Sequence, residues 1–275
     1  MPELPEVETI RRGIAPQVSG RVLSDLILRR TDLRWPIPGE QLRREAVGHP
    51  IRGVERRGKY LLLPCGPGRL LLHLGMSGSL HLPEPDLPPG KHDHLDLVLD
   101  GGQRLLRLRD PRRFGALLWL TGAPEAHPLL ARLGPEPLGE AFHGDHLHRL
   151  ARGRRVALKN FLMDGRVVVG VGNIYAAEAL FRAGLHPALV VGRLDAGQWH
   201  RLAAAVQEVL TAAIASGGTS LRDYVKSDGK PGYFKQALRV YGRVGQACGR
   251  CGTVIESLRL GQRASCFCPG CQGRG

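Results

Sequence analysis

Hydrophobic and polar residues follow two different periods along the chain, and the change falls near residue 137. From residue 21 to residue 120, short apolar runs such as HLDLVLD alternate with polar positions, and Gly/Pro-rich segments such as PCGPG and DGGQ separate them. A period of two predicts strands with one buried face, and many such runs predict a β-sandwich or barrel. A helix is expected ahead of them, over residues 3–15, with Pro16 near its end.

The second half of the chain has helical spacing. Its apolar residues recur every three or four positions in HGDHLHRLARG, VALKNFLMDG, NIYAAEALFRAG and LDAGQWHRLAAAVQEVLTAAIASG, and each of these segments ends in glycine. The pattern therefore predicts an α+β protein in three parts. These are a β-sandwich with a leading helix (1–136), a helical domain (137–236) and a small C-terminal unit (237–275).

The charge of the chain narrows the class of partner. The formal net charge is +14 at pH 7, and the segment from Lys226 to the end carries half of it. Such an excess favours a polyanion. A membrane surface is the weaker alternative, because no run of some 18 apolar residues and no signal-peptide core is found. Nucleic acid is therefore the expected partner.

Cysteines predict a metal site in the C-terminal part. Two CxxC pairs stand sixteen residues apart, and together they offer four thiolates: Cys248, Cys251, Cys268 and Cys271. This spacing is typical of a closed, structural Zn²⁺ site, and disulfides are the alternative. Cys266 competes for a ligand position, whereas Cys65 is expected to be a buried thiol. No redox or nucleotide cofactor is expected.

The first residues, MPELPEVETI, carry candidate chemistry. Removal of the initiator methionine would leave Pro2 as a free secondary amine with Glu3 beside it. An α-amine has a pKa near 8 against about 10.4 for lysine, so more of it is neutral and nucleophilic at pH 7. The alternative is a plain helix start, since proline and acids both suit the first helical turn.

Several motifs, taken in order, give the chain a family resemblance. They are PELPEVE, RRGKYLL, HLGMSGSL, KHDHLDLVLD, DPRRFG, LGPEPL, LMDGRVVVGVGNIYAAEALFRAGLHP, SDGKPGYF and the two CxxC pairs. Over essentially its whole length the chain resembles the formamidopyrimidine-DNA glycosylases. The resemblance implies an N-terminal β-sandwich, a helix–two-turn–helix domain and a C-terminal zinc finger, with damaged double-stranded DNA in the cleft between domains. It also implies a cytoplasmic, nucleoid-associated bacterial protein.

The resemblance also implies roles in catalysis. Pro2 would attack C1′ of the damaged nucleotide to form a Schiff base, and Glu3 would act as general acid. Lys59 matches the lysine assigned to β-elimination, and Arg263 the arginine assigned to δ-elimination. Both residues also suit plain phosphate contacts. Glu6, one turn after Glu3, is interpreted as structural.

Further residues match DNA contacts of the family. The wedge that fills the place of the flipped base would be Met76, Arg112 and Phe114, although the two apolar members also suit an ordinary core. The remaining contacts are His92, Arg155, Asn173, Lys159 and Tyr241, of which Asn173 begins a helix after a glycine turn that suits a phosphate. The SDGKPGYF loop (227–234) would close over the base.

Two other functions remain as alternatives. Endonuclease VIII-like glycosylases, which remove oxidised pyrimidines, share the proline and the adjacent glutamate. Leu4 favours the purine-specific branch, because the sister group typically has glycine there. A non-catalytic zinc-finger damage binder is the second alternative, and intact Pro2, Glu3 and Lys59 argue against it. The protein is expected to act as a monomer.

Overall fold

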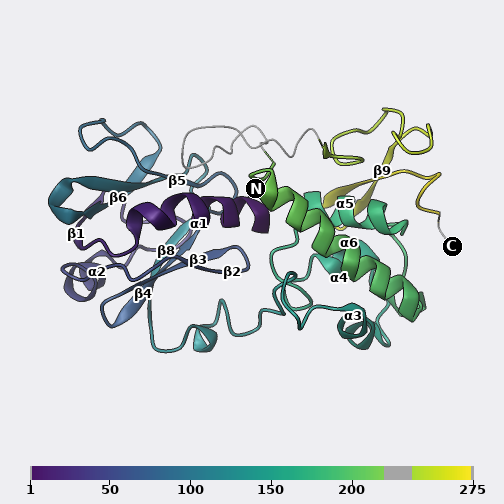
Figure 1. Cartoon of the computed structure of the whole chain (residues 1–275), viewed down its shortest axis with the longest axis horizontal. Helices are drawn as coiled ribbons and strands as arrows, with labels where there is room; N and C mark the ends of the chain where they lie inside the picture. Colours follow the sequence, from purple (N-terminus) through teal and green to yellow (C-terminus); the bar gives the residue numbers. More distant parts are fainter. Residues whose placement is uncertain (1, 220–236, 274–275) are drawn as a thin grey trace. The chain divides into compact units, whose positions relative to one another are not determined.

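The computed structural model describes residues 2–219 and 237–273. It divides into two compact units, which are considered one at a time (Figure 1). The first unit comprises Met1–Ala131 with Ser216–Tyr233, and the second comprises Arg132–Ala215 with Phe234–Gly275. The predicted capping loop, 227–234, lies outside the described residues.

The first unit is a β-sandwich, as predicted. One four-stranded antiparallel sheet has the order β1 (Leu23–Leu28), β6 (Asp93–Leu99), β7 (Arg104–Arg109), β5 (Ser79–His81). The other has the order β2 (Glu55–Arg57), β3 (Tyr60–Cys65), β4 (Gly68–His73), β8 (Ala116–Thr121). Leucines from both sheets form one buried cluster, which identifies the two sheets as layers of one core.

Helices also contribute to the core of this unit. Helix α1 (Leu4–Val18) buries Val7, Ile10 and Ile14 in the same cluster, and it extends through Pro16, beyond the predicted end at residue 15. The shorter elements are α2 (Gly39–Glu45), η1 (Asp100–Gly102) and η2 (Pro124–Ala126).

Strand β6 corrects one prediction. Its alternating sequence predicts one exposed face, yet all seven of its residues are buried. Asp96 is tolerated there because Arg107, its cross-strand partner on β7, donates two hydrogen bonds to the carboxylate, at 2.8 and 3.0 Å. In this bidentate geometry the two buried charges neutralise each other, and their hydrogen bonds take the place of those to water.

The second unit contains the remaining helices and the C-terminal hairpin. Its elements are α3 (Gly144–Ala151), α4 (Leu158–Leu162), α5 (Asn173–Ala183), η3 (Val191–Arg193), α6 (Ala196–Ala215), β9 (Glu256–Leu260) and β10 (Arg263–Phe267). Helix α6 packs against α3 and α5, and α5 also contacts β10. Helix α5 ends at Gly184, whose φ of 70° favours glycine. Among the described residues, no helix combines the length and apolar character that a membrane crossing requires.

An apolar cluster joins the helices to the hairpin. Ala177 and Phe181 of α5 pack with Val240, Ile255 and Phe267. The helical and C-terminal parts therefore share one compact unit. The boundaries at residues 136/137 and 236/237 stay predictions.

Candidate active site and metal centre

The start of helix α1 holds its polar groups away from solvent. Pro2 is buried, and Glu3 and Glu6 are each 2% exposed. One oxygen of Glu6 accepts the backbone N–H of Glu3 and the other accepts that of Thr219, each at 2.8 Å. Glu6 therefore fixes the backbone beside Pro2, which agrees with the structural interpretation of this residue.

Gly218 allows the contact between Thr219 and Glu6. Its φ is 79°, and a Cβ atom at this position would lie 3.1 Å from the Glu6 carboxylate. The GG pair before Thr219 is thus required by a close approach and a left-handed backbone.

A second carboxylate on α1 holds the turn that carries Lys59. Glu8 is 7% exposed, and its Oε2 accepts a hydrogen bond from Arg56 Nε at 3.0 Å. Arg56 Nη1 in turn donates to the carbonyl of Gly58 at 3.0 Å. Gly58 and Lys59 form the turn between β2 and β3. The contacts from Glu8 through Arg56 to Gly58 therefore fix this turn relative to α1.

Arginine neighbours change the titration of Glu8. Burial alone would raise the pKa of its carboxyl, but hydrogen bonds from Arg11, Arg12 and Arg56 outweigh burial and lower the pKa to about 2. The group is therefore ionised across the neutral range, and its charge contributes to the stability of the fold.

We expect Glu8→Gln to destabilise the protein in a pH-dependent way. The pKa is about 2 in the folded protein against an ordinary 4.5, so the charge stabilises above pH 4.5 and this contribution disappears toward pH 2. The gap corresponds to about 3 kcal/mol. Urea denaturation at neutral pH and near pH 3 measures it. Glu40→Gln, at a carboxylate that is 95% exposed, is the control, and equal pH profiles for the two variants would contradict the assignment.

The wedge candidates come from two turns that a buried aspartate joins. Asp110 is fully buried; it accepts a hydrogen bond from Ser77 Oγ at 2.7 Å and one from the N–H of Gly115, also at 2.7 Å. Ser77 Oγ accepts the N–H of Arg112 at 3.0 Å. The structure therefore brings the turn of Met76 next to the turn of Arg112 and Phe114.

Exposure separates the wedge interpretation from the core interpretation. Phe114 is 44% exposed, and the Arg112 guanidinium lies 5.2 Å from its ring centroid. Met76 is half-buried in its turn. A core role therefore does not fit Phe114, although packing rules alone favour it. His92 lies beside this pair of turns, since its carbonyl accepts the N–H of Asp110 at 2.9 Å.

His73 is a residue of this region that sequence reasoning missed. Its Nδ1 accepts the N–H of Gly75 at 3.1 Å, and its ring lies 4.8 Å from that of Tyr60. Burial, followed by the charges of Lys59 and Arg34, lowers its pKa to about 4, so the ring is neutral at pH 7. His73 thus connects the strand after Lys59 to the turn of Met76. The polar residue that ends the run RLLLH was the available signal.

In the second unit, a buried glutamate fixes the backbone near Tyr241. Glu178 of α5 is 4% exposed and accepts backbone N–H groups from Arg239, Val240 and Tyr241, at 2.8 to 3.0 Å. Burial raises the pKa of Glu178 and these three donors oppose it. Tyr241 is therefore fixed to the helix that begins at Asn173.

Two other candidates for DNA contacts lie outside or at the start of helices in this unit. Asn173 is the first residue of α5, and its buried Oδ1 accepts no hydrogen bond from the described residues. Gly172 precedes it in extended backbone and accepts the N–H of Ala176 at 3.0 Å, so the helix begins directly after the glycine turn, a position that suits a phosphate. Arg155 is exposed in the segment between α3 and α4.

Lys159 and Arg263 meet the same hairpin differently. Lys159 is 1% exposed, and its Nζ donates to Ala264 O and to Ser265 Oγ, each at 2.9 Å. Arg263 begins β10, is exposed and pairs with Leu260 across the turn, so it lies near the tip of the hairpin. The ammonium of Lys159 thus points into the protein, whereas a phosphate contact would require it at the surface.

We expect Lys159→Met to misplace the hairpin without removing a phosphate contact. The variant leaves two buried acceptors without their donor, a cost of about 1–3 kcal/mol. Binding to lesion DNA should weaken while the slope of affinity against salt stays unchanged. Arg155→Met is the comparison, because a lost phosphate contact reduces that slope by about one. A reduced slope for Lys159→Met would restore the phosphate interpretation.

Four cysteines form the metal centre. The sulfur atoms of Cys248, Cys251, Cys268 and Cys271 all lie within 4.8 Å of one another, with nearest pairs at 3.4 and 4.0 Å. Thiolates at 2.3 Å around a tetrahedral Zn²⁺ lie about 3.8 Å apart, so the set fits this ion. Gly270 leaves room for the second knuckle, because a Cβ there would meet Thr253 and Cys251. Cys266 lies outside the set and packs in the apolar cluster.

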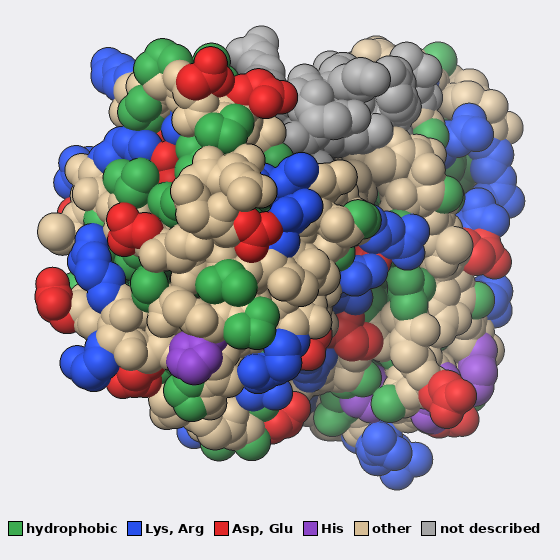
Figure 2. Space-filling view, turned by 60° about the vertical axis from the view of Figure 1, so that its left-hand side comes forward, with side chains coloured by type: hydrophobic (Ala, Val, Ile, Leu, Met, Phe, Trp, Pro, Cys, Tyr) green, Lys and Arg blue, Asp and Glu red, His purple; other side chains and the backbone are tan. Residues whose placement is uncertain are grey.

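These features define a class of protein. A closed set of four thiolates makes the zinc structural, and Arg263 projects from the hairpin that it stabilises. On the part of the molecule that Figure 2 shows, basic side chains are spread among acidic ones, so charge does not outline a single binding surface on this face. A net charge of +14 together with the zinc hairpin nevertheless places the chain among zinc-containing nucleic-acid-binding proteins.

Comparisons with known proteins identify the family. Residues 1–117 match the formamidopyrimidine-DNA glycosylase N-terminal domain, residues 133–225 the H2TH domain of the same glycosylase, and residues 245–273 the zinc finger found in FPG and IleRS. The chain belongs to the formamidopyrimidine-DNA glycosylase family.

Individual relatives agree over the whole chain. The formamidopyrimidine-DNA glycosylase of Magnetococcus marinus is 57% identical over 274 residues, 99% of each chain. That of Methylococcus capsulatus is 58% identical, over 99% of this chain and all of the relative. Among solved structures, a mutant FPG of Lactococcus lactis in complex with Fapy-dG-containing DNA has a TM-score of 0.91 and 34% identity, over 99% of this chain and 100% of its own. MutM (FPG) of Thermus thermophilus has a TM-score of 0.86 and 42% identity, with full coverage of both chains.

Proposed function

We propose that this protein is a base-excision repair enzyme that removes oxidised purines from duplex DNA and then cleaves the strand. It is a DNA glycosylase with AP lyase activity, as membership of the family implies. The observation that carries the chemical step is the buried start of α1, where Glu6 holds the backbone between Pro2 and Glu3 in place.

The first step is base excision by the N-terminal amine. With the initiator methionine removed, the Pro2 nitrogen attacks C1′, and a C–N bond forms as the bond to the damaged base breaks. The base leaves with the bonding electron pair and takes up one proton, which balances the N–H proton that the attached nitrogen releases. Glu3 delivers a proton to the ring oxygen, which opens the sugar. A secondary amine yields an iminium that is cationic without further protonation, and this cation stabilises the electron pair released in the next step.

Strand cleavage follows from the iminium. Loss of a C2′ proton expels the 3′ phosphate by β-elimination, and a second proton loss expels the 5′ phosphate by δ-elimination. Lys59 is assigned to the first elimination and Arg263 to the second. The fixed turn of Lys59 and the exposed position of Arg263 on its hairpin support these assignments.

Access to the base requires that it leave the stack. Phe114 and Met76 would then fill the gap, and Arg112 would contact the orphaned base. Exposure of Phe114 and the shared Ser77–Asp110 anchor support this role. His92, Arg155, Asn173 and Tyr241 are proposed DNA contacts. Lys159, whose buried ammonium donates to Ala264 and Ser265, is instead proposed to hold the hairpin in place. The enzyme is proposed to act as a monomer.

Borohydride trapping tests the proposal. A duplex with one 8-oxoguanine opposite cytosine should give a covalent adduct, and mass mapping should place it on Pro2. Trapping only on an oxidised pyrimidine would assign the protein to the endonuclease VIII-like group. Tight binding without an adduct on either lesion would indicate a non-catalytic damage binder, and an adduct on a lysine would overturn the role of Pro2.

A further inference from the structure

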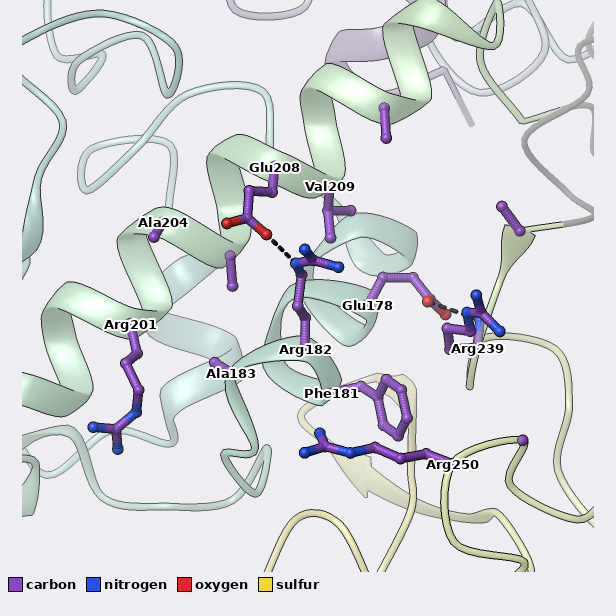
Figure 3. A pocket seen from close by; sticks show the side chains of 14 residues that line it. Glu178, Phe181, Arg182, Ala183, Arg201, Ala204, Glu208, Val209, Arg239 and Arg250 are labelled. Atoms are coloured by element: carbon purple, nitrogen blue, oxygen red, sulfur yellow. Dashed lines mark hydrogen bonds and ion pairs between the residues drawn. The ribbon is translucent and has the colours of Figure 1, made fainter.

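A pocket in the second unit lies apart from the residues assigned to DNA. Its volume is about 850 Å³, and it is bounded by helix α5, helix α6, the backbone near Arg239 and the first zinc knuckle (Figure 3). Its α5 residues belong to the last turns of that helix, whereas Asn173 is at the first. None of the predicted DNA contacts lines the pocket.

The floor of the pocket is apolar. Phe181, Ala205 and Val209 line it and are 7%, 4% and 9% exposed. Ala204 and Ala212 of α6 extend the same surface with small, exposed side chains. A concave apolar surface with small residues at its margin accommodates a bulky apolar side chain from outside.

The rim of the pocket is strongly basic. Arg182, Arg201, Arg239 and Arg250 line it, and all four are exposed (Figure 3). Its two carboxylates are already engaged, because Glu208 pairs with Arg182 and Glu178 accepts three backbone N–H groups. Within the described part of the chain, Arg201, Arg239 and Arg250 form no ion pair.

We propose that this pocket binds an acidic segment of a partner protein that presents one bulky apolar side chain. The apolar side chain would occupy the floor at Phe181, and flanking carboxylates would meet the guanidinium groups of the rim. Arginine is suited to this task because its planar fork binds carboxylates through two hydrogen bonds. The apolar floor accounts for the bulky side chain of the ligand, and the arginines of the rim account for its acidic residues.

Nucleic acid fits the same pocket less well. A phosphate backbone would satisfy the arginines but would leave the buried apolar floor of the pocket without a partner. A peptide that combines acidic and apolar residues satisfies both surfaces. The proposal is independent of the catalytic assignments, since the residues involved take no part in them.

Fluorescence anisotropy with short labelled peptides tests the proposal on the full-length, zinc-loaded protein. The probe GDDEFDDG is expected to bind with a dissociation constant of about 10 µM, within the range of small interfaces. GDDESDDG lacks the apolar anchor and GNNQFNNG lacks the charge, and each should bind at least about tenfold more weakly. If GDDESDDG bound as tightly as GDDEFDDG, general charge attraction would explain the binding, and the proposal would be overturned.

Variants then locate the binding. The double variant Arg201→Glu, Arg250→Glu should weaken GDDEFDDG at least about tenfold. Arg193→Glu, at an exposed arginine of the same unit outside the pocket, makes the same charge change as Arg201→Glu alone and should weaken peptide binding much less than that variant. Arg201→Glu alone should leave excision of 8-oxoguanine unchanged. Equal weakening by Arg193→Glu, or displacement of the peptide by undamaged duplex, would overturn the proposal in favour of general charge attraction or a nucleic-acid surface.

Discussion

One alanine added ahead of Pro2 is expected to abolish base excision and to leave lesion binding within a few-fold of normal. The added residue converts the proline nitrogen into an amide, whose lone pair is delocalised and cannot attack C1′. Loss of a covalent nucleophile should lower the single-turnover rate at least about 10³-fold. Pro2 is buried beside the Glu3–Glu6 contact, and the new α-amine of the added alanine lies one residue away from this position.

The experiment compares chains whose N-termini are verified by mass spectrometry. One begins at Pro2 and the other at the added alanine, and both are tested for excision of 8-oxoguanine, borohydride trapping and affinity for an uncleavable lesion analogue. An alanine inserted after Gly102, in the exposed turn that follows β6, controls for insertion itself. Normal excision by the extended chain would exclude the N-terminal amine as nucleophile, whereas loss of binding would point to a disturbed site.

Local pattern was sufficient for much of the fold. Alternation and turn signals predict strands one at a time, and short turns join the neighbouring pairs β3–β4 and β6–β7. The pairing of β1 with β6 and of β4 with β8 joins strands that are distant in sequence and has no such signal. The CxxC spacing predicts the metal ligands. Pattern failed at β6, where Asp96 lies inside because Arg107 on the next strand neutralises it. A residue's exposure depends on its cross-strand partner, which periodicity alone does not specify.

The site depended more on contacts between distant residues. Glu8 and Arg56 meet across 48 positions, and Glu178 meets Tyr241 across 63. Such pairs have no local signature, since a lone glutamate on a helix usually faces solvent. Phe114 shows the reverse case, because an aromatic residue expected in a core is held at the surface by the turn that Asp110 anchors. At Glu8, Glu178 and Phe114, tertiary contacts override the local preference of the residue, and such departures are common in functional regions.

Removal of zinc is expected to unfold the C-terminal hairpin and to eliminate tight binding of lesion DNA. The hairpin has only two strands, which are marginal by themselves, and a structural Zn²⁺ contributes about 10–16 kcal/mol to the folding of such small units. Two of the ligands, Cys248 and Cys268, also belong to the apolar cluster that contains Phe181 of α5. Loss of the metal therefore removes the thiolate–zinc bonds of the hairpin and also disturbs the apolar cluster that packs the hairpin against α5.

A comparison of Cys271→Ser with Cys266→Ala, both treated with the same chelator, separates the role of the metal from that of the apolar cluster. Cys266 is 6% exposed and packs among the same apolar residues but offers no ligand, so Cys266→Ala should retain one zinc per chain and near-normal affinity. The ligand variant should lose zinc, measured by a colorimetric chelator, and weaken lesion binding more than about 100-fold. Since Arg263 lies on the hairpin, residual product should also shift from δ- toward β-elimination. Retained zinc in Cys271→Ser with loss in Cys266→Ala would reassign the fourth ligand to Cys266.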